Sequence, residues 1–177
     1  MKNSAMGIAI GKIFPTARTN CYIEIFDQNI NYILDSIKNN SKKTIIFTQF
    51  LKVAKHINVE LTKNNIGNVL IIGETKNRLE VINRFKEDDS IDVLIATTQT
   101  LSTGVTLTEA NQILFFGTPY RDADFQQACD RIHRIGQTLD VYIYIILLKS
   151  AKKNITNRLD DIINWSKQST TDFMDLE

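Results

Sequence analysis

Two arginines and a glutamine stand close together in residues 127–137, which read Gln-Ala-Cys-Asp-Arg-Ile-His-Arg-Ile-Gly-Gln. Read as a helix at about 100° per residue, this stretch places Gln127, Arg131 and Arg134 in one stripe. A guanidinium is permanently charged and forked, so two of them on one stripe suit the binding of phosphate. The spacing therefore predicts an anion-binding face on a helix.

The same stretch has an apolar side that would hold the helix on a core. This second stripe consists of Ala128, Ile132 and Ile135. Glycine commonly follows the last residue of a helix, so Gly136 would mark the end of this one. The polar residues also fit a different interpretation, in which they form an exposed face with an Asp130–Arg134 pair at i,i+4 spacing.

Alternating strand and helix patterns surround this stretch. Short apolar runs predict buried parallel strands, and apolar spacings of three and four residues predict helices. The predicted strands cover residues 44–47, 68–72, 92–96, 112–116 and 141–148, and the predicted helices lie near residues 30–37, 50–61, 79–85 and 155–162. This order indicates an α/β domain with a mainly parallel sheet flanked by helices.

Composition limits the class of protein. The chain has 177 residues, 43% of them hydrophobic, and a formal net charge of +1, so we expect one globular domain and, at most, a local basic groove. We assign residues 1–27 to an N-terminal linker segment, 28–165 to the domain and 166–177 to a polar tail. No apolar run approaches the roughly 20 residues that span a bilayer. We expect a monomer without membrane attachment.

The cysteines and the strand ends suggest where chemistry takes place. Cys21 and Cys129 lack a CxxC spacing, so no metal or disulfide site is expected and a reducing compartment is the default. In parallel α/β folds, ligands gather at the carboxyl ends of strands. We expect residues 48–50, 97–111 and 127–137 to meet at that edge.

Short hydroxyl side chains near a glycine can contact phosphates closely. The candidate contacts to phosphate are Thr48, Gln49, Thr97, Thr98, Ser102 and Thr103, with Gly104 beside them. A polar turn before a strand would explain residues 97–111 equally well.

Residues 127–137 resemble the last conserved motif of the superfamily 2 helicases, in the form typical of the Swi/Snf-type chromatin remodellers and DNA translocases. Residues 97–111 are similar to the motif of that family that ends Gly-x-x-Leu-Thr-x-Ala-Asn, and residues 44–50 to its Phe-Ser/Thr-Gln-Phe strand. Gly73, Arg78 and Phe85 match its Gly…Arg…Phe spacing. The resemblance covers residues 44–148.

This resemblance implies the second RecA-like lobe of a P-loop-NTPase-type motor. Arg131 and Arg134, with Gln127, would act catalytically on ATP and Mg²⁺ held mainly by a first lobe, in cis or in trans. Gly104 would lie at the nucleotide, and the loop before it on double-stranded DNA. A cytoplasmic, nucleoid or, in a eukaryote, nuclear location would follow.

Other features separate this chain from a complete motor. It contains no G-x-x-x-x-G-K-[ST] phosphate loop and no Asp-Glu pair after a strand, so we expect no ATPase activity from it alone. Residues 117–122 replace the family's Asp-x-x-Trp-Asn-Pro, and Thr106 stands where Asn is common. The alternatives are a strand-separating helicase or restriction-type motor lobe, a non-enzymatic nucleic-acid-binding module, and a flavodoxin-like nucleotide binder.

Overall fold

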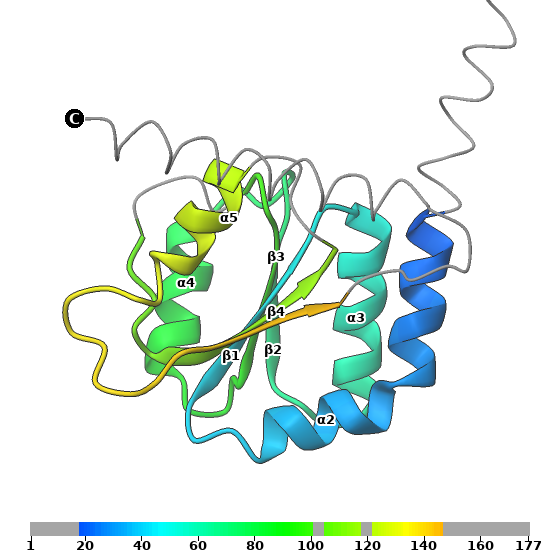
Figure 1. The fold of residues 1–177 in the computed structure, drawn as a ribbon, viewed down its shortest axis with the longest axis horizontal. Helices are drawn as coiled ribbons and strands as arrows, with labels where there is room; N and C mark the ends of the chain where they lie inside the picture. The colour runs from blue at the N-terminus through cyan, green and yellow to red at the C-terminus, as the bar shows by residue number, and fades with distance from the viewer. Residues whose placement is uncertain (1–17, 101–104, 118–121, 147–177) are drawn as a thin grey trace, which may run out of the picture.

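A computed structural model describes residues 18–100, 105–117 and 122–146 (Figure 1). Its five strands form one sheet in the order β2-β3-β1-β4-β5, and all four neighbouring pairs are parallel. The strands are β1 (Lys43–Thr48), β2 (Asn68–Ile71), β3 (Val93–Thr97), β4 (Ala110–Phe116) and β5 (Tyr142–Ile146). The predicted α/β domain with a parallel sheet is confirmed.

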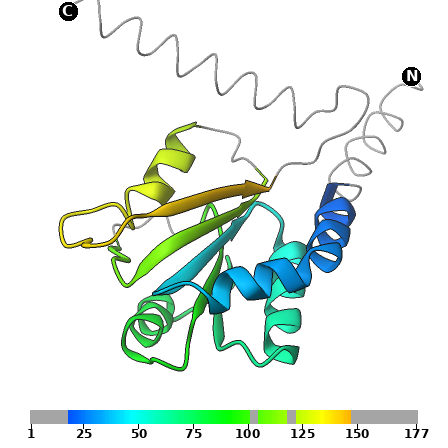
Figure 2. The ribbon, with the colours of Figure 1, turned by 60° about the horizontal axis from the view of Figure 1, so that its bottom comes forward.

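Helices cover both faces of the sheet (Figure 2). The labelled helices are α2 (Ile30–Lys38), α3 (Leu51–Lys63), α4 (Arg78–Glu87) and α5 (Asp122–Cys129). The N-terminal helix (residues 18–28), α2 and α3 pack on one face, and α4 and α5 pack on the other. No helix among the described residues has both the length and the apolar character needed to cross a membrane.

The N-terminal helix belongs to the packed domain. Tyr22 and Phe26 are fully buried, and the Phe26 ring lies 5.7 Å from that of Phe116 in β4. The weak apolar pattern of residues 1–27 predicts a linker, and this prediction is wrong for residues 18–27, which are helical. The predicted helix near residues 155–162 and the polar tail at 166–177 lie outside the described residues.

Polar side chains tie the layers together near the amino ends of the strands. The buried Thr44 hydroxyl donates to Gln112 Oε1 at 2.8 Å, and Gln112 Nε2 in turn lies 2.7 Å from the Ser36 hydroxyl of α2. Lys43 Nζ donates to the Phe85 carbonyl at 2.6 Å, in the last turn of α4. Buried polar groups need such partners, so these contacts favour this one register between strands and helices.

Two glycines offer a test of this packing. A Cβ on Gly67 would lie 1.6 Å from the Ser90 carbonyl oxygen, whereas a Cβ on Gly73 would meet nothing within 4 Å. Since the obstacle at Gly67 is backbone, we expect Gly67→Ala to lower the free energy of unfolding by about 3 kcal/mol. Gly73→Ala should change it by less than about 0.5 kcal/mol. Urea unfolding of both variants measures the difference, and equal midpoints would contradict the close approach.

Candidate functional site

The connection between β3 and β4 runs from the carboxyl end of the sheet to its amino end. Thr97 pairs with Thr48 at the carboxyl end of β1, and Ala110 pairs with Lys43 at its amino end. Because β3 and β4 are parallel, the chain must return between these ends through residues 98–109. Residues 101–104, which include the candidates Ser102, Thr103 and Gly104, lie outside the described residues.

The arginine-bearing stretch is only partly helical. Helix α5 ends at Cys129, and residues 130–136 form turns and bends, so the predicted continuous helix is wrong beyond Cys129. The Arg131 carbonyl accepts a 2.8 Å hydrogen bond from the Leu107 N–H, whereas in a helix it would accept from the N–H four residues later. Gly136, with φ of +106°, therefore lies in a turn and does not follow a helix end.

Both arginines nevertheless converge on one short backbone segment. Arg131 Nη1 donates to the Val105 carbonyl at 3.2 Å, and Arg134 Nη1 donates to the Thr106 hydroxyl at 2.8 Å. Arg131 is half-buried and Arg134 is exposed. The tertiary structure thus groups the two guanidiniums by attaching both to residues 105–106.

The other residues of this stretch follow the predicted stripes less closely. Ala128 and Ile132 are buried as expected, but Ile135 is fully exposed, because the helix has already ended. Gln127 lies on α5, and within the described part of the chain its side chain is exposed to solvent.

The arginine pair is short of negative charge. Burial lowers the pKa of Arg131, the neighbouring Arg134 lowers it further, and Asp130 acts in the opposite direction. Among the described residues, neither guanidinium forms an ion pair with a carboxylate, so the alternative Asp130–Arg134 pair does not form. A bound anion would relieve both the desolvation and the repulsion, which makes this position suited to phosphate.

Gln137, to which sequence analysis gave no role, holds the end of this stretch. Its Nε2 donates to the Ala110 carbonyl at 2.8 Å, and its Oε1 accepts from the Leu139 N–H at 3.1 Å. This amide fastens the loop to the first residue of β4. The loop is therefore anchored at Arg131, through the Leu107 N–H, and at Gln137, through the Ala110 carbonyl.

A second candidate surface lies at the carboxyl end of the strands. The backbone N–H of Thr98 donates to the Thr48 carbonyl at 3.1 Å, and the buried Thr100 hydroxyl donates to the Thr97 carbonyl at 2.7 Å. A pocket of about 280 Å³ opens here, lined by Gln49, Leu51, Gly73, Glu74, Thr97, Thr98, Gln99, Thr100 and Asp124.

The candidates at this edge differ in access. Gln49, Thr97 and Thr98 are half-buried and line the pocket. The side chain of Thr48 is fully buried, and its hydroxyl accepts from the Phe50 N–H at 3.2 Å. Thr48 therefore shapes the loop from inside and does not offer its hydroxyl to a ligand.

Arg78 supports this edge in a way that the sequence did not reveal. Its Nη2 donates to the Gly73 carbonyl at 3.0 Å, and its Nη1 lies 3.5 Å from the Thr100 carbonyl. The guanidinium at the start of α4 thus bridges the ends of β2 and β3. A carbonyl partner leaves no signal in a sequence, since every residue has one.

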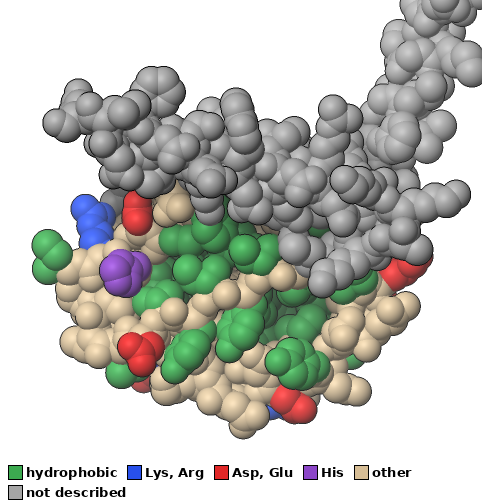
Figure 3. Space-filling view, viewed as in Figure 1, with side chains coloured by type: hydrophobic (Ala, Val, Ile, Leu, Met, Phe, Trp, Pro, Cys, Tyr) green, Lys and Arg blue, Asp and Glu red, His purple; other side chains and the backbone are tan. Residues whose placement is uncertain are grey.

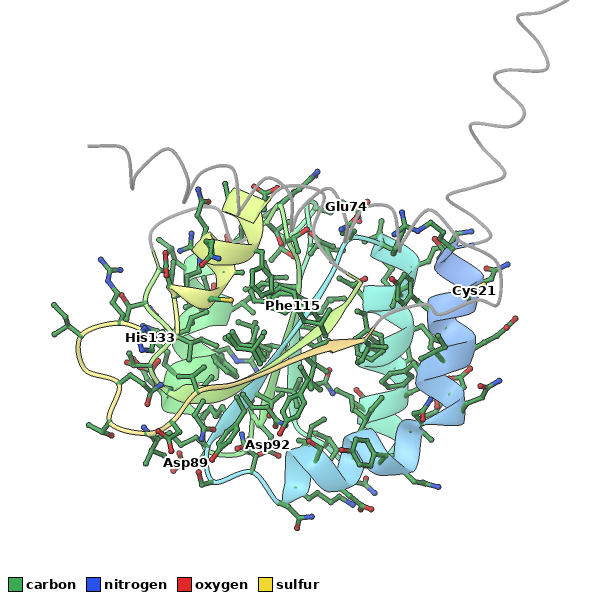
Figure 4. All side chains as sticks on the ribbon, in the orientation of Figure 1. Cys21, Glu74, Asp89, Asp92, Phe115 and His133 are labelled. Atoms are coloured by element: carbon green, nitrogen blue, oxygen red, sulfur yellow. The ribbon has the colours of Figure 1, made fainter. Side chains whose placement is uncertain are left out.

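The two candidate surfaces are separate, so the expected meeting of three loops at one edge is wrong. The turns at residues 130–136, which carry Arg131 and Arg134, are called the arginine loop below. In Figure 4, His133 of this loop lies on one side of the domain, and Glu74 lies at the carboxyl end of the sheet. The arginine loop is fastened near Ala110, at the amino end of β4, because residues 105–110 have already returned there. Within the described part of the chain, no group of His, Cys, Asp or Glu side chains is arranged to hold a metal ion.

Comparison with known proteins identifies the class. Residues 25–136 match the family described as the helicase conserved C-terminal domain. The chain belongs to this family, and its parallel sheet is the RecA-like fold. It is, more particularly, the C-terminal helicase domain of the Swi/Snf type within superfamily 2, which confirms the resemblance seen in its motifs.

Its relatives are much longer proteins. The chain is 35% identical over 139 residues to a probable ATP-dependent helicase of Plasmodium falciparum, covering 77% of this chain and 6% of that protein. It is 30% identical over 155 residues to helicase SWR1 of Saccharomyces cerevisiae, covering 82% of this chain and 10% of that protein. The crystal structure of the C-terminal part of the Fun30 ATPase domain superposes with a TM-score of 0.69 and 27% identity, over 77% of this chain and 44% of that chain. The chain thus spans about a tenth or less of these two helicases.

The anchor at Gln137 can be tested on stability. We expect Gln137→Ala to lower the free energy of unfolding by about 1–2 kcal/mol, because it leaves the Ala110 carbonyl without this donor. Gln127→Ala removes the same type of side chain from an exposed position on α5 and should cost less than about 0.5 kcal/mol. Chemical denaturation of both variants measures the costs, and a loss of equal size in each would show that Gln137 is no special anchor.

Proposed function

We propose that this chain acts as the second lobe of an ATP-dependent DNA translocase of the Swi/Snf type and does not hydrolyse ATP alone. A first RecA-like lobe, in cis or in trans, supplies the phosphate loop and the Mg²⁺ ligands that this sequence lacks. The residues present fit one part of the site only: a guanidinium pair suited to phosphate, and no acidic group suited to the metal among those described.

The arginine pair is the observation that carries this proposal. Arg131 and Arg134 are held by bonds to uncharged oxygens of residues 105–106, so their charge is not cancelled within the described domain. When the two lobes close on ATP, these guanidiniums bind and orient phosphate oxygens and stabilise the charge that develops there. Gln127, exposed on the preceding helix, can approach the same ligand.

The carboxyl edge is proposed to face DNA. Gln49, Thr97 and Thr98 offer an amide and two hydroxyls on half-buried, well-fixed backbone, which suits sequence-independent contacts to phosphates. Ser102 and Thr103 are proposed to extend these contacts. The connection between β3 and β4 begins at this edge and contacts the arginine-bearing stretch through residues 105–107. A movement at the carboxyl edge can therefore be passed along the backbone to the arginine pair.

The arginine assignment predicts a loss of turnover without a loss of folding. In the complete two-lobe enzyme, we expect Arg131→Ala and Arg134→Ala to lower DNA-stimulated ATP turnover by about 10³ to 10⁵. Arg84→Ala, which removes an exposed arginine from α4, should leave turnover unchanged. Steady-state ATPase assays and thermal unfolding of the same proteins provide the measurements.

The controls separate this role from a structural one. Lower melting temperatures with normal turnover of the folded enzyme would show that the arginines only support the loop. The isolated chain should give no ATP turnover above background, and turnover abolished by Arg134→Ala would refute the proposed need for a first lobe. Strand-displacement assays on the complete enzyme would identify the strand-separating alternative.

If the carboxyl edge faces DNA, the isolated chain should bind duplex DNA weakly. The affinity should fall as the salt concentration rises, because such binding is driven by counterion release. Gln99→Glu places one negative charge beside Thr98 with little change of shape, and should weaken binding about fivefold, or about 1 kcal/mol. Gln28→Glu, exposed on the N-terminal helix, makes the same change in net charge and should have no effect. Fluorescence anisotropy at several salt concentrations measures this, and equal effects or salt-independent binding would place DNA elsewhere.

A further inference from the structure

Among the described residues, strand β5 is much less buried than a parallel strand normally is. Residues 142–145 are 41–50% exposed, whereas every residue of β4 beside it is buried. Parallel strands are usually covered on both faces, which is why they are so apolar. The sequence Tyr-Ile-Tyr-Ile-Ile has the composition of a buried strand and therefore requires a partner.

One face of β5 borders an apolar groove. In register, Tyr144 lies beside Leu114 and Ile146 beside Phe116, on the face that α2 and the N-terminal helix cover. Between these helices and β5 lies a groove of about 300 Å³, whose apolar lining includes Ile25, Tyr32, Ile33, Leu114, Tyr144 and Ile146. Figure 3 shows hydrophobic side chains gathered over the middle of this view of the domain. A contiguous apolar surface of this kind marks a binding site.

The chain itself carries a segment of matching pattern shortly after the groove. At about 100° per residue, Ile155, Leu159 and Ile162 form one stripe, with Ile163 on one flank and Trp165, next to Arg158, on the other. The polar side is formed by Thr156, Asn157, Asp160, Asp161 and Asn164. Such a segment must bury one side and leave the other in water.

Length and position also fit. As a helix, residues 155–165 would be about 16 Å long, close to the roughly 17 Å of a five-residue strand such as β5. Strand β5 ends at Ile146, in the wall of the groove. The connecting residues 147–154 would reach roughly 28 Å when extended, enough to bring the next segment back over the strand.

We propose that residues 155–165 form an amphipathic helix that docks in this groove, against α2 and β5 of the same chain. The docked helix covers Tyr32 and Tyr144 and completes the layer that the N-terminal helix begins. The proposal concerns the assembly of the domain and is independent of the nucleotide and DNA assignments.

Trp165 is the single tryptophan of the chain and reports directly on this segment. In the intact folded chain, we expect its emission at shorter wavelength than in urea, and several-fold weaker quenching by iodide. Tyr32→Lys puts a charge on the groove and should move emission to longer wavelength and raise quenching. Val59→Lys makes the same kind of change at an exposed site of α3 outside the groove and should do neither.

A second pair of variants tests the segment from its own side. Leu159→Asp interrupts the apolar stripe and should expose Trp165, whereas Asn157→Asp adds the same charge on the polar side and should leave it protected. Far-ultraviolet circular dichroism confirms that each variant remains folded.

Several outcomes would overturn the docking. Trp165 quenched in the intact chain as strongly as in urea would show that the segment is not packed. A response to Leu159→Asp but not to Tyr32→Lys would place it on another surface. Protection that is lost on dilution, as size-exclusion chromatography shows a dimer dissociating, would assign the groove to a second copy of the chain.

Discussion

The parallel pairing of β1 with β3 on one side and β4 on the other is the constraint on which the rest of this domain depends. Because all three strands run in the same direction, the chain that leaves β3 at Thr97 must travel back along the sheet to enter β4 at Ala110. This return segment has one end at the carboxyl edge and the other beneath the arginine loop. The proposed DNA and nucleotide surfaces are therefore connected by a few residues of backbone.

The second feature of physical importance is the way in which the arginines are held. A buried guanidinium usually finds a carboxylate, which would satisfy its charge and reduce its attraction for a ligand. Here Arg131 and Arg134 instead contact a carbonyl and a hydroxyl, which fix direction without cancelling charge. This arrangement supports the proposal that the pair binds an anion supplied from outside the described domain.

Much of this molecule could be predicted from local pattern. The strand runs and the amphipathic spacing of α2, α3 and α4 located these elements within a few residues, because burial of one side is a property of each segment. The motif match identified the family, and the missing phosphate loop led to the proposal that another lobe supplies this part of the site. The N-terminal helix was missed because Tyr22 and Phe26 are its only fully buried apolar side chains, and the polar Thr19 continues their buried stripe.

The positions of the candidate functional residues relative to one another were decided by the tertiary structure alone. Helical periodicity placed Arg131 and Arg134 on one stripe, but the Leu107 N–H takes the Arg131 carbonyl and the helix stops at Cys129. Arg78 likewise acts through backbone carbonyls that any sequence provides. The sequence by itself therefore determined which elements form and to which family they belong. Only the folded chain decided the grouping of the arginines, the burial of Thr48 and the separation of the two surfaces, because each depends on hydrogen bonds between segments distant in sequence.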